Sequence, residues 1–245
     1  MINLKSPKEI ECMRKAGHIL RDLFLELDER VKPGVSLKKL DEFAYDYIKR
    51  HGCVPSCLGY GGFPGTICAS VDEQVVHGFP TARRLEEGQI VGLDIVLSLN
   101  GWHADATRTY CVGEVSAEKK ALVETTKESF FEGVKQFREG NRLGDICHAI
   151  QEYNESRGYG VVRAMVGHGI GREMHEDPQV PNYGKAGHGP KLEVGMVLAI
   201  EPMVNMGTWQ VLEDGWKCVT LDGKPSAHYE NTVALTENGA EILTL

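Results

Sequence analysis

The feature that most constrains the fold is an internal repeat with a period of about 107 residues. Residues 85–94 (LEEGQIVGLD) reappear as residues 192–201 (LEVGMVLAIE), and in both copies an acid ends the apolar run. A second echo, between Gly34 and Gly140, has an offset of 106 residues, and matching apolar residues follow both glycines. Two independent segments with nearly the same period predict that the chain is built from two related halves.

Each predicted half begins with helices and continues with strands. The first helices start at N-capping residues, Ser6 with Glu9 in one half and Ser116 in the other. A second helix is predicted at residues 37–50 and at residues 143–157, and a glycine closely follows each. Because two helices cannot cover both faces of the strands in one half, we expect the halves to share one sheet backed by helices.

Composition places the chain among ordinary globular proteins. Its 245 residues, 42% of them apolar, suffice for a single domain over residues 1–245, with halves of about 1–112 and 113–245. A net charge of −8 argues against a nucleic-acid or acidic-lipid surface. The sequence has no signal peptide and no long apolar run, and its seven cysteines include no Cys-x-x-Cys pair. These features predict a cytoplasmic protein that binds neither nucleic acid nor a membrane.

A short hairpin brings two acids together. The Asn-Gly pair at residues 100–101 is typical of a two-residue turn, and strands paired around it set Asp94 opposite Thr107 and Asp105 opposite Val96. Both carboxylates then lie on one face of an otherwise apolar ribbon. Such acids repel one another and resist burial unless a cation holds them. At this point two solvated acids on an open face remain the alternative.

The second half supplies further polar residues that interrupt apolar runs, namely His168, Glu201 and Glu230. A buried strand that ends in a carboxylate needs a charged partner, and no lysine or arginine is an obvious one. Together with Asp94 and Asp105, these residues carry four negative charges, which two divalent cations would balance. Oxygen-rich ligation suits Mn, Fe, Co or Zn better than a thiolate site would.

The ordered set of these residues closely resembles the bacterial-type (type I) methionine aminopeptidases of peptidase family M24. The residues that carry the resemblance span the chain: Val76-His77-Gly78, Asp94, Asp105, His168, His175-Glu176-Asp177-Pro178, Glu201, Trp216 and Glu230. The resemblance implies the pita-bread fold, an α/β (α+β) structure in which two pseudo-twofold-related halves share a central antiparallel sheet backed by helices. It also implies hydrolytic removal of N-terminal methionine when the second residue is small and uncharged.

The same resemblance implies a dinuclear metal centre. Asp94 would bind one cation, Asp105 and Glu230 would bridge both, and His168 and Glu201 would bind the other. The two divalent cations, Co, Mn, Fe or Zn, would activate a water molecule between them as the nucleophile.

The resemblance also implies catalytic and substrate-binding residues. Glu201 would carry the proton of the water to the leaving amine, His175 would donate to the oxyanion, and His77 would hydrogen-bond the scissile amide or the leaving nitrogen. The implied methionine pocket consists of Cys57, Tyr60, Phe63, Cys68 and Trp216. Apolar, sulfur-containing and aromatic walls of this kind suit a polarizable thioether.

Two positions depart from the family pattern. Met174 precedes His175 where an aromatic residue is common, and His228 lies two residues before Glu230 where glutamine is often found. These departures concern the pocket edge and a nearby accessory cation site rather than the ligands. As partners, the resemblance implies nascent polypeptide N-termini, with the ribosome surface as a candidate docking site and a monomer as the expected state. The sequence itself identifies neither the physiological metal nor the oligomeric state.

Other interpretations are weaker. Aminopeptidase P and prolidase share the fold and ligand order but usually carry an additional N-terminal domain, and only about 93 residues precede the first ligand here. Non-catalytic pita-bread modules lose ligands, whereas all five positions are present. The glycines at 167–171 do not form a dinucleotide motif because Arg172 stands where glycine is needed. A thiolate zinc site at Cys53, Cys57 and Cys68 would lack a fourth ligand.

Overall fold

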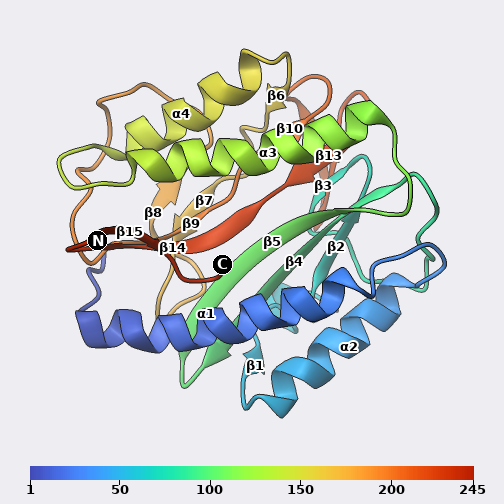
Figure 1. Cartoon of the computed structure of the whole chain (residues 1–245), viewed down its shortest axis with the longest axis horizontal. Helices are drawn as coiled ribbons and strands as arrows, with labels where there is room; N and C mark the ends of the chain where they lie inside the picture. Colours follow the sequence, from blue (N-terminus) through green and yellow to red (C-terminus); the bar gives the residue numbers. More distant parts are fainter.

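The structure, a computed structural model, describes all 245 residues and is built around a nine-stranded antiparallel sheet (Figure 1). The strands follow the order β1-β4-β5-β14-β9-β7-β8, with β15 paired to β14 and β2 paired to β4. They are β1 (Val54–Pro55), β2 (Cys68–Val71), β4 (Ile90–Leu99), β5 (Trp102–Cys111), β7 (Gly167–Gly169), β8 (Glu176–Val180), β9 (Val197–Ile200), β14 (Glu230–Thr236) and β15 (Gly239–Ile242). The β5–β14 pair joins the strands of the two predicted halves into one sheet.

Two small sheets, ordered β13-β10-β6 and β11-β12-β3, complete the strand structure. Their strands are β3 (Gln74–Val76), β6 (Gly160–Val161), β10 (Met203–Asn205), β11 (Val211–Asp214), β12 (Lys217–Thr220) and β13 (Ser226–His228). A short 3-10 helix, η1 (Tyr60–Gly62), follows β1. These elements matter for the site because β3 leads into His77, β13 ends at His228 and η1 begins at Tyr60.

Four α-helices cover the sheet: α1 (Pro7–Asp28), α2 (Leu37–Arg50), α3 (Ala117–Gln136) and α4 (Leu143–Glu155). In the view of Figure 1, α1 and α2 lie below the central strands, and α3 and α4 lie above them. The predicted antiparallel sheet backed by helices is therefore confirmed. None of these helices combines the length and the apolar character needed to cross a membrane.

Each helix pair packs on the sheet through its own hydrophobic core. Leu20 of α1 and Leu40 of α2 belong to the same fully buried cluster as Ile95 of β4. Phe130 of α3 belongs to a second cluster with Val233 of β14. Close-packed interiors of this kind have little freedom to shift. The strands that carry the site residues are therefore held rigidly from the helix side.

The helix boundaries agree closely with the sequence. The Ser6 backbone N–H donates to Glu9 Oε2 at 2.8 Å, which completes the capping box at the start of α1. Helix α2 spans the predicted residues. Helix α4 ends at Glu155, two residues before the predicted end. The chain turns earlier because Gly158 adopts a φ of 83° and the Tyr159 N–H bonds back to a carbonyl of the last turn.

Candidate active site

Strands β4 and β5 form the predicted hairpin. Turn residues 100–101 both have positive φ, 53° and 76°, as a two-residue type I′ turn requires. The register pairs Asp94 with Thr107 and Asp105 with Val96, as predicted. The two carboxylates therefore project from the same face of the ribbon, one diagonal step apart.

Strands of the second half bring the other polar residues to this hairpin. Glu230 opens β14 opposite Thr107 of β5, and Thr107 Oγ1 donates a hydrogen bond to Glu230 Oε2 at 2.8 Å. Glu201 directly follows β9, and His168 is the middle residue of β7, which pairs with β9. Because β5, β14, β9 and β7 are consecutive neighbours in the sheet, residues far apart in the sequence meet.

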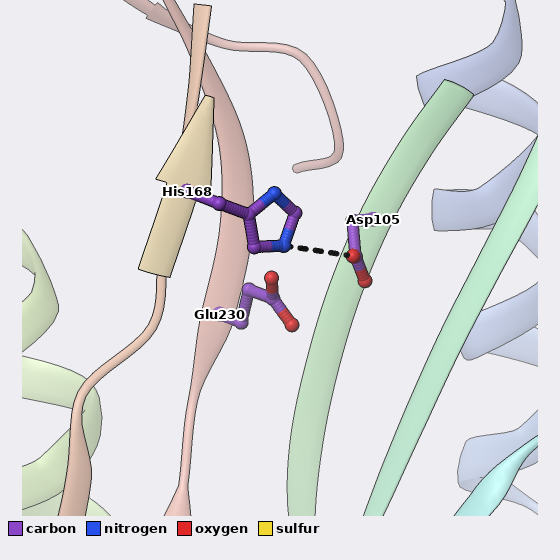
Figure 2. Close-up of side chains that lie close together, drawn as sticks. All are labelled: Asp105, His168 and Glu230. Carbon is purple, nitrogen blue, oxygen red and sulfur yellow. Dashed lines mark ion pairs between the residues drawn. The ribbon is translucent and has the colours of Figure 1, made fainter. Parts of the chain in front are cut away.

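His168 lies among the carboxylates (Figure 2). Its Nε2 is 3.6 Å from Asp105 Oδ2 and 3.6 Å from Glu201 Oε1. Its Nδ1 is 2.9 Å from the Gly169 carbonyl oxygen, which can only accept, so Nδ1 carries the proton and Nε2 presents a lone pair. One ligand atom each from Asp105, His168 and Glu230 lies within 4.8 Å of the others. A lone pair that faces two ionised carboxylates is repelled unless a cation or a proton lies between them.

The four carboxyl groups lack a cationic partner from the protein. The only ion-pair partners of Asp105 and Glu201 are histidines, and Asp94 and Glu230 form no ion pair. Burial raises the pKa of all four, and repulsion between neighbouring carboxylates adds to the rise for Asp105, Glu201 and Glu230. Asp105 Oδ1 and Glu230 Oε1 have no hydrogen-bond partner. This donor set fits divalent cations, which would supply the missing positive charge and use the free lone pairs.

The alternative thiolate site is not formed. Cys53 is buried in the core beneath α1 and α2, whereas Cys57 and Cys68 belong to a separate cluster at the cavity. The Asp105, His168 and Glu230 side chains form the one group of three or more potential ligands close enough to share a metal ion.

One cavity of about 490 Å³ contains every residue predicted for the site. These residues are Cys57, Tyr60, Phe63, Cys68, His77, Asp94, Asp105, His168, His175, Glu201, Trp216 and Glu230. The apolar wall is a buried cluster of Cys57, Phe63, Cys68, Val96 and Met174, with Trp216 packed against it. This wall adjoins the acids directly, because Cys68 pairs with Asp94 and Val96 pairs with Asp105 in the strand register.

Two further histidines line the cavity. His175 Nδ1 is 3.0 Å from the Tyr60 hydroxyl, and its ring meets His168 edge-on with 4.4 Å between centroids. His77 has a φ of 58°, which is uncommon for a residue other than glycine, and its ring stands edge-on to Trp216. Burial lowers the pKa of both His77 and His175, so both imidazoles are neutral at pH 7.

Comparison with known proteins identifies the family. Residues 11–237 match the description "Metallopeptidase family M24". The chain belongs to metallopeptidase family M24. A methionine aminopeptidase of Clostridium perfringens is 55% identical over 100% of this chain and 99% of the relative. Methionine aminopeptidase 1 of Bacillus subtilis is 50% identical over the same shares of both chains.

Solved structures agree with the assignment of this chain to family M24. The crystal structure of methionine aminopeptidase from Rickettsia prowazekii has a TM-score of 0.98, 39% identity and 100% coverage of both chains. The prolidase of Pyrococcus furiosus has a TM-score of 0.77 and 24% identity, and the match covers 99% of this chain but 65% of the prolidase. The second likeness concerns the fold alone. Together they confirm the predicted pita-bread fold of this metallopeptidase.

His228 is a site residue of this M24 chain that the sequence interpretation treated only as a departure. Its buried Nε2 is 3.5 Å from Glu201 Oε2 and has no hydrogen-bond partner. Burial lowers its pKa to about 4. Met203 of β10, which pairs with His228 in the β10–β13 strand register, also lines the cavity. The spacing of two residues between His228 and Glu230 was the available signal, because in extended chain such residues point to the same side.

Divalent cations should raise the melting temperature of this M24 peptidase more at pH 8 than at pH 6. In the metal-free protein the raised pKa values keep protons on the buried carboxyl groups, whereas the unfolded chain releases them above its ordinary pKa. The folded state then binds more protons, so the stability of the metal-free protein falls as the pH rises. Cations displace these protons and compete with fewer of them at pH 8. His168, with a pKa lowered to about 4, is neutral at both pH values.

Thermal unfolding with chelator and with Mn²⁺ at the two pH values measures this effect. An Asp105→Ala and Glu230→Ala double variant is the control and should show little response to Mn²⁺ at either pH. A cation-induced shift in wild-type protein that is equal or smaller at pH 8 contradicts the prediction.

Proposed function

We propose that this protein is a methionine aminopeptidase, which hydrolyses the peptide bond after the N-terminal methionine of nascent proteins and peptides when the second residue is small and uncharged. The observation that carries the proposal is a single cavity in which an apolar, sulfur-containing wall adjoins buried carboxylates and a histidine. An exopeptidase needs these two features in contact, because the side chain to be enclosed belongs to the residue next to the bond that is cut. The full-length relatives named methionine aminopeptidase support the same activity.

The proposed cofactors are two divalent cations, of Co, Mn, Fe or Zn. Asp94 would hold one, Asp105 and Glu230 would hold both, and His168 with Glu201 would hold the other. Bound there, the cations would lower the pKa of a water molecule and polarise the scissile carbonyl. The unpartnered oxygens of Asp105 and Glu230 and the lone pair of His168 support this assignment.

The methionine side chain is proposed to occupy the apolar wall of the cavity. Phe63 and Trp216 meet edge-on with ring centroids 5.4 Å apart, and the thiols of Cys57 and Cys68 lie in the same cluster. A flexible thioether makes favourable contacts with aromatic rings and fills irregular gaps. Tyr60, which is 48% exposed, would close the outer side of this pocket.

Glu201 is proposed to move the proton of the attacking water. Its two carboxylate oxygens lie near His168 and His228, so the group sits beside the ligand cluster where the water must be. Asn182 Nδ2 donates to the Glu201 backbone carbonyl at 2.9 Å and holds the main chain at this position. From there the carboxylate would accept the proton and return it to the leaving nitrogen.

The two cavity histidines are proposed to bind the reacting amide. A Tyr60 hydroxyl that donates to His175 Nδ1 leaves the imidazole proton on Nε2, which is then free to donate to the oxyanion. His77 would hydrogen-bond the scissile amide or the leaving nitrogen. A bulky second side chain would meet the His77 ring where it stands against Trp216, which supports the preference for small second residues.

The test is a competition among five peptides, with Mn²⁺-loaded protein and free amino acids as the readout. The peptides are Met-Ala-Ser, Leu-Ala-Ser, Met-Lys-Ser, Ala-Pro-Ser and the dipeptide Ala-Pro. We expect release of methionine from Met-Ala-Ser alone, and none from its N-acetylated form, because the free amine must lie beside the carboxylate cluster.

The other outcomes separate the rival functions. Faster cleavage of Ala-Pro-Ser would identify an aminopeptidase P, and faster cleavage of Ala-Pro would identify a prolidase. If the metal-loaded protein cleaves none of the five peptides, a peptide-binding module becomes the better explanation.

A further inference from the structure

A buried ion pair ties the segment before α1 to the loop that carries His175. Lys5 Nζ is 2.6 Å from Glu176 Oε2, and the two side chains are only 5% and 7% exposed. The next most buried pair between a lysine or arginine and a carboxylate, Lys119 with Asp72, is 19% and 18% exposed. Desolvation makes such a buried pair a weak source of stability, so stability alone does not explain its presence. Its place beside the cavity suggests one.

Further hydrogen bonds connect the pair to three segments of the chain. Lys5 Nζ also donates to the Asn3 carbonyl oxygen at 3.0 Å, and the Lys5 backbone N–H donates to the Gly195 carbonyl oxygen at 2.7 Å. Glu176 Oε1 accepts from the Glu173 backbone N–H at 3.3 Å. The pair therefore links the N-terminal segment, the turn before β9 and the loop between β7 and β8.

The loop is shaped around the ion pair at Gly171. A Cβ at this position would lie 2.5 Å from Lys5 Cε and 2.6 Å from Glu176 Oε1, closer than real Cβ contacts come. The Gly171 carbonyl oxygen accepts from the His103 backbone N–H at 2.9 Å, which joins the same loop to β5. Glycine at this position thus leaves the space that the paired side chains fill.

The pair acts on the backbone directly beside His175. The loop has no regular secondary structure from Gly171 to His175, and β8 begins at the next residue, Glu176. The His175 side chain contacts the Tyr60 hydroxyl and the His168 ring, but neither contact holds its main chain. The backbone on the C-terminal side of His175 is held at Glu176, whose main chain pairs with Gly169 of β7 and whose side chain binds Lys5.

We propose that the Lys5–Glu176 ion pair is a positioning device that holds the His175 imidazole at the cavity. The inference rests on the proposed function, in which His175 donates to the oxyanion. Lys5 acts only through the loop backbone and contacts no reacting atom. A displacement of about 1 Å at a catalytic group is sufficient to lower a rate by 10- to 100-fold. An ion pair one residue from His175 that prevents such a displacement would therefore offset the cost of burying its two charges.

A double-mutant cycle with Lys5→Met and His175→Ala tests the proposal on Met-Ala-Ser. In the wild-type background, Lys5→Met should lower kcat about 10-fold with little change in KM and with unchanged metal content. In the His175→Ala background, the same substitution should change kcat less than about 2-fold, because no imidazole remains to be positioned. A merely structural role would give the same loss in both backgrounds, and that result overturns the proposal.

Matched variants control for folding and for charge. Lys5→Arg keeps the charge and should recover most of kcat. Arg14→Met breaks another ion pair near the N-terminus, with Glu241 at 2.6 Å, and should leave kcat unchanged. If Lys5→Met does not fold, Glu176→Gln, which keeps the size of the side chain but only one of its two acceptor oxygens, should show a loss of the same kind.

A second readout needs no activity. Imidazole NMR signals of His175 should shift or broaden in Lys5→Met but not in Arg14→Met, and unchanged signals in Lys5→Met would refute the positioning role. A wild-type protein that cleaves none of the five peptides refutes the proposed function instead, whereas an active wild type with additive losses refutes the positioning role alone.

Discussion

Chelation of the bound cations should lower the rate of methionine release by roughly 10³-fold or more, and addition of Mn²⁺, Co²⁺ or Fe²⁺ should restore it. Without cations, the raised pKa values of Asp105, Glu201 and Glu230 favour their protonated forms, and no lysine or arginine lines the cavity to take the place of the cations. The measurement is the rate on Met-Ala-Ser together with the metal content before and after chelation. Full activity of thoroughly demetallated protein contradicts the proposed mechanism.

Ligand variants provide the control for this result. Asp105→Ala and Glu230→Ala should lose more metal and more activity than Asp94→Ala when all are purified identically. Asp105 and Glu230 belong with His168 to the closest group of ligand atoms, and each has an oxygen without a partner. Asp94 lies outside that group, one diagonal step along the hairpin. Equal loss of metal in all three variants would contradict the proposal that Asp105 and Glu230 hold both cations while Asp94 holds only one.

Replacement of His175 by alanine should lower kcat roughly 10²-fold while the metal content stays unchanged. The imidazole lines the cavity and is neutral because burial lowers its pKa, so it can donate one hydrogen bond as negative charge develops on the carbonyl oxygen. It lies outside the group of ligand atoms formed by Asp105, His168 and Glu230. Steady-state kinetics and elemental analysis on the same preparation measure both quantities.

Two further variants, one at a contact of His175 and one far from the cavity, serve as comparisons for the His175→Ala result. Tyr60→Phe removes the hydroxyl 3.0 Å from His175 Nδ1 and should give a smaller loss of kcat in the same direction. His51→Ala, on the far end of α2, should leave kcat unchanged. If His175→Ala loses metal along with rate, His175 is a ligand or a support of the ligands rather than an oxyanion donor.

Local patterns in the sequence were sufficient for the hairpin and for the candidate metal ligands, whereas His77, His175 and the methionine pocket followed only from the family resemblance. The Asn-Gly turn at residues 100–101 sets the register of its own two strands, so the positions of Asp94 and Asp105 followed without knowledge of the fold. His168, Glu201 and Glu230 were recognisable because each interrupts an apolar run. Capping residues likewise act within a few positions of the helix ends that they define.

The tertiary structure decided how these parts meet. Strand β14 inserts between β5 and β9, and this order alone brings Glu230 to Thr107 and His168 to Asp105. The burial of His228 and the ion pair from Lys5 to the His175 loop also depend on contacts between residues far apart in the chain. Such contacts are set by the packing of whole elements, which no local pattern encodes, and the chemistry of the cavity depends on the burial that this packing creates.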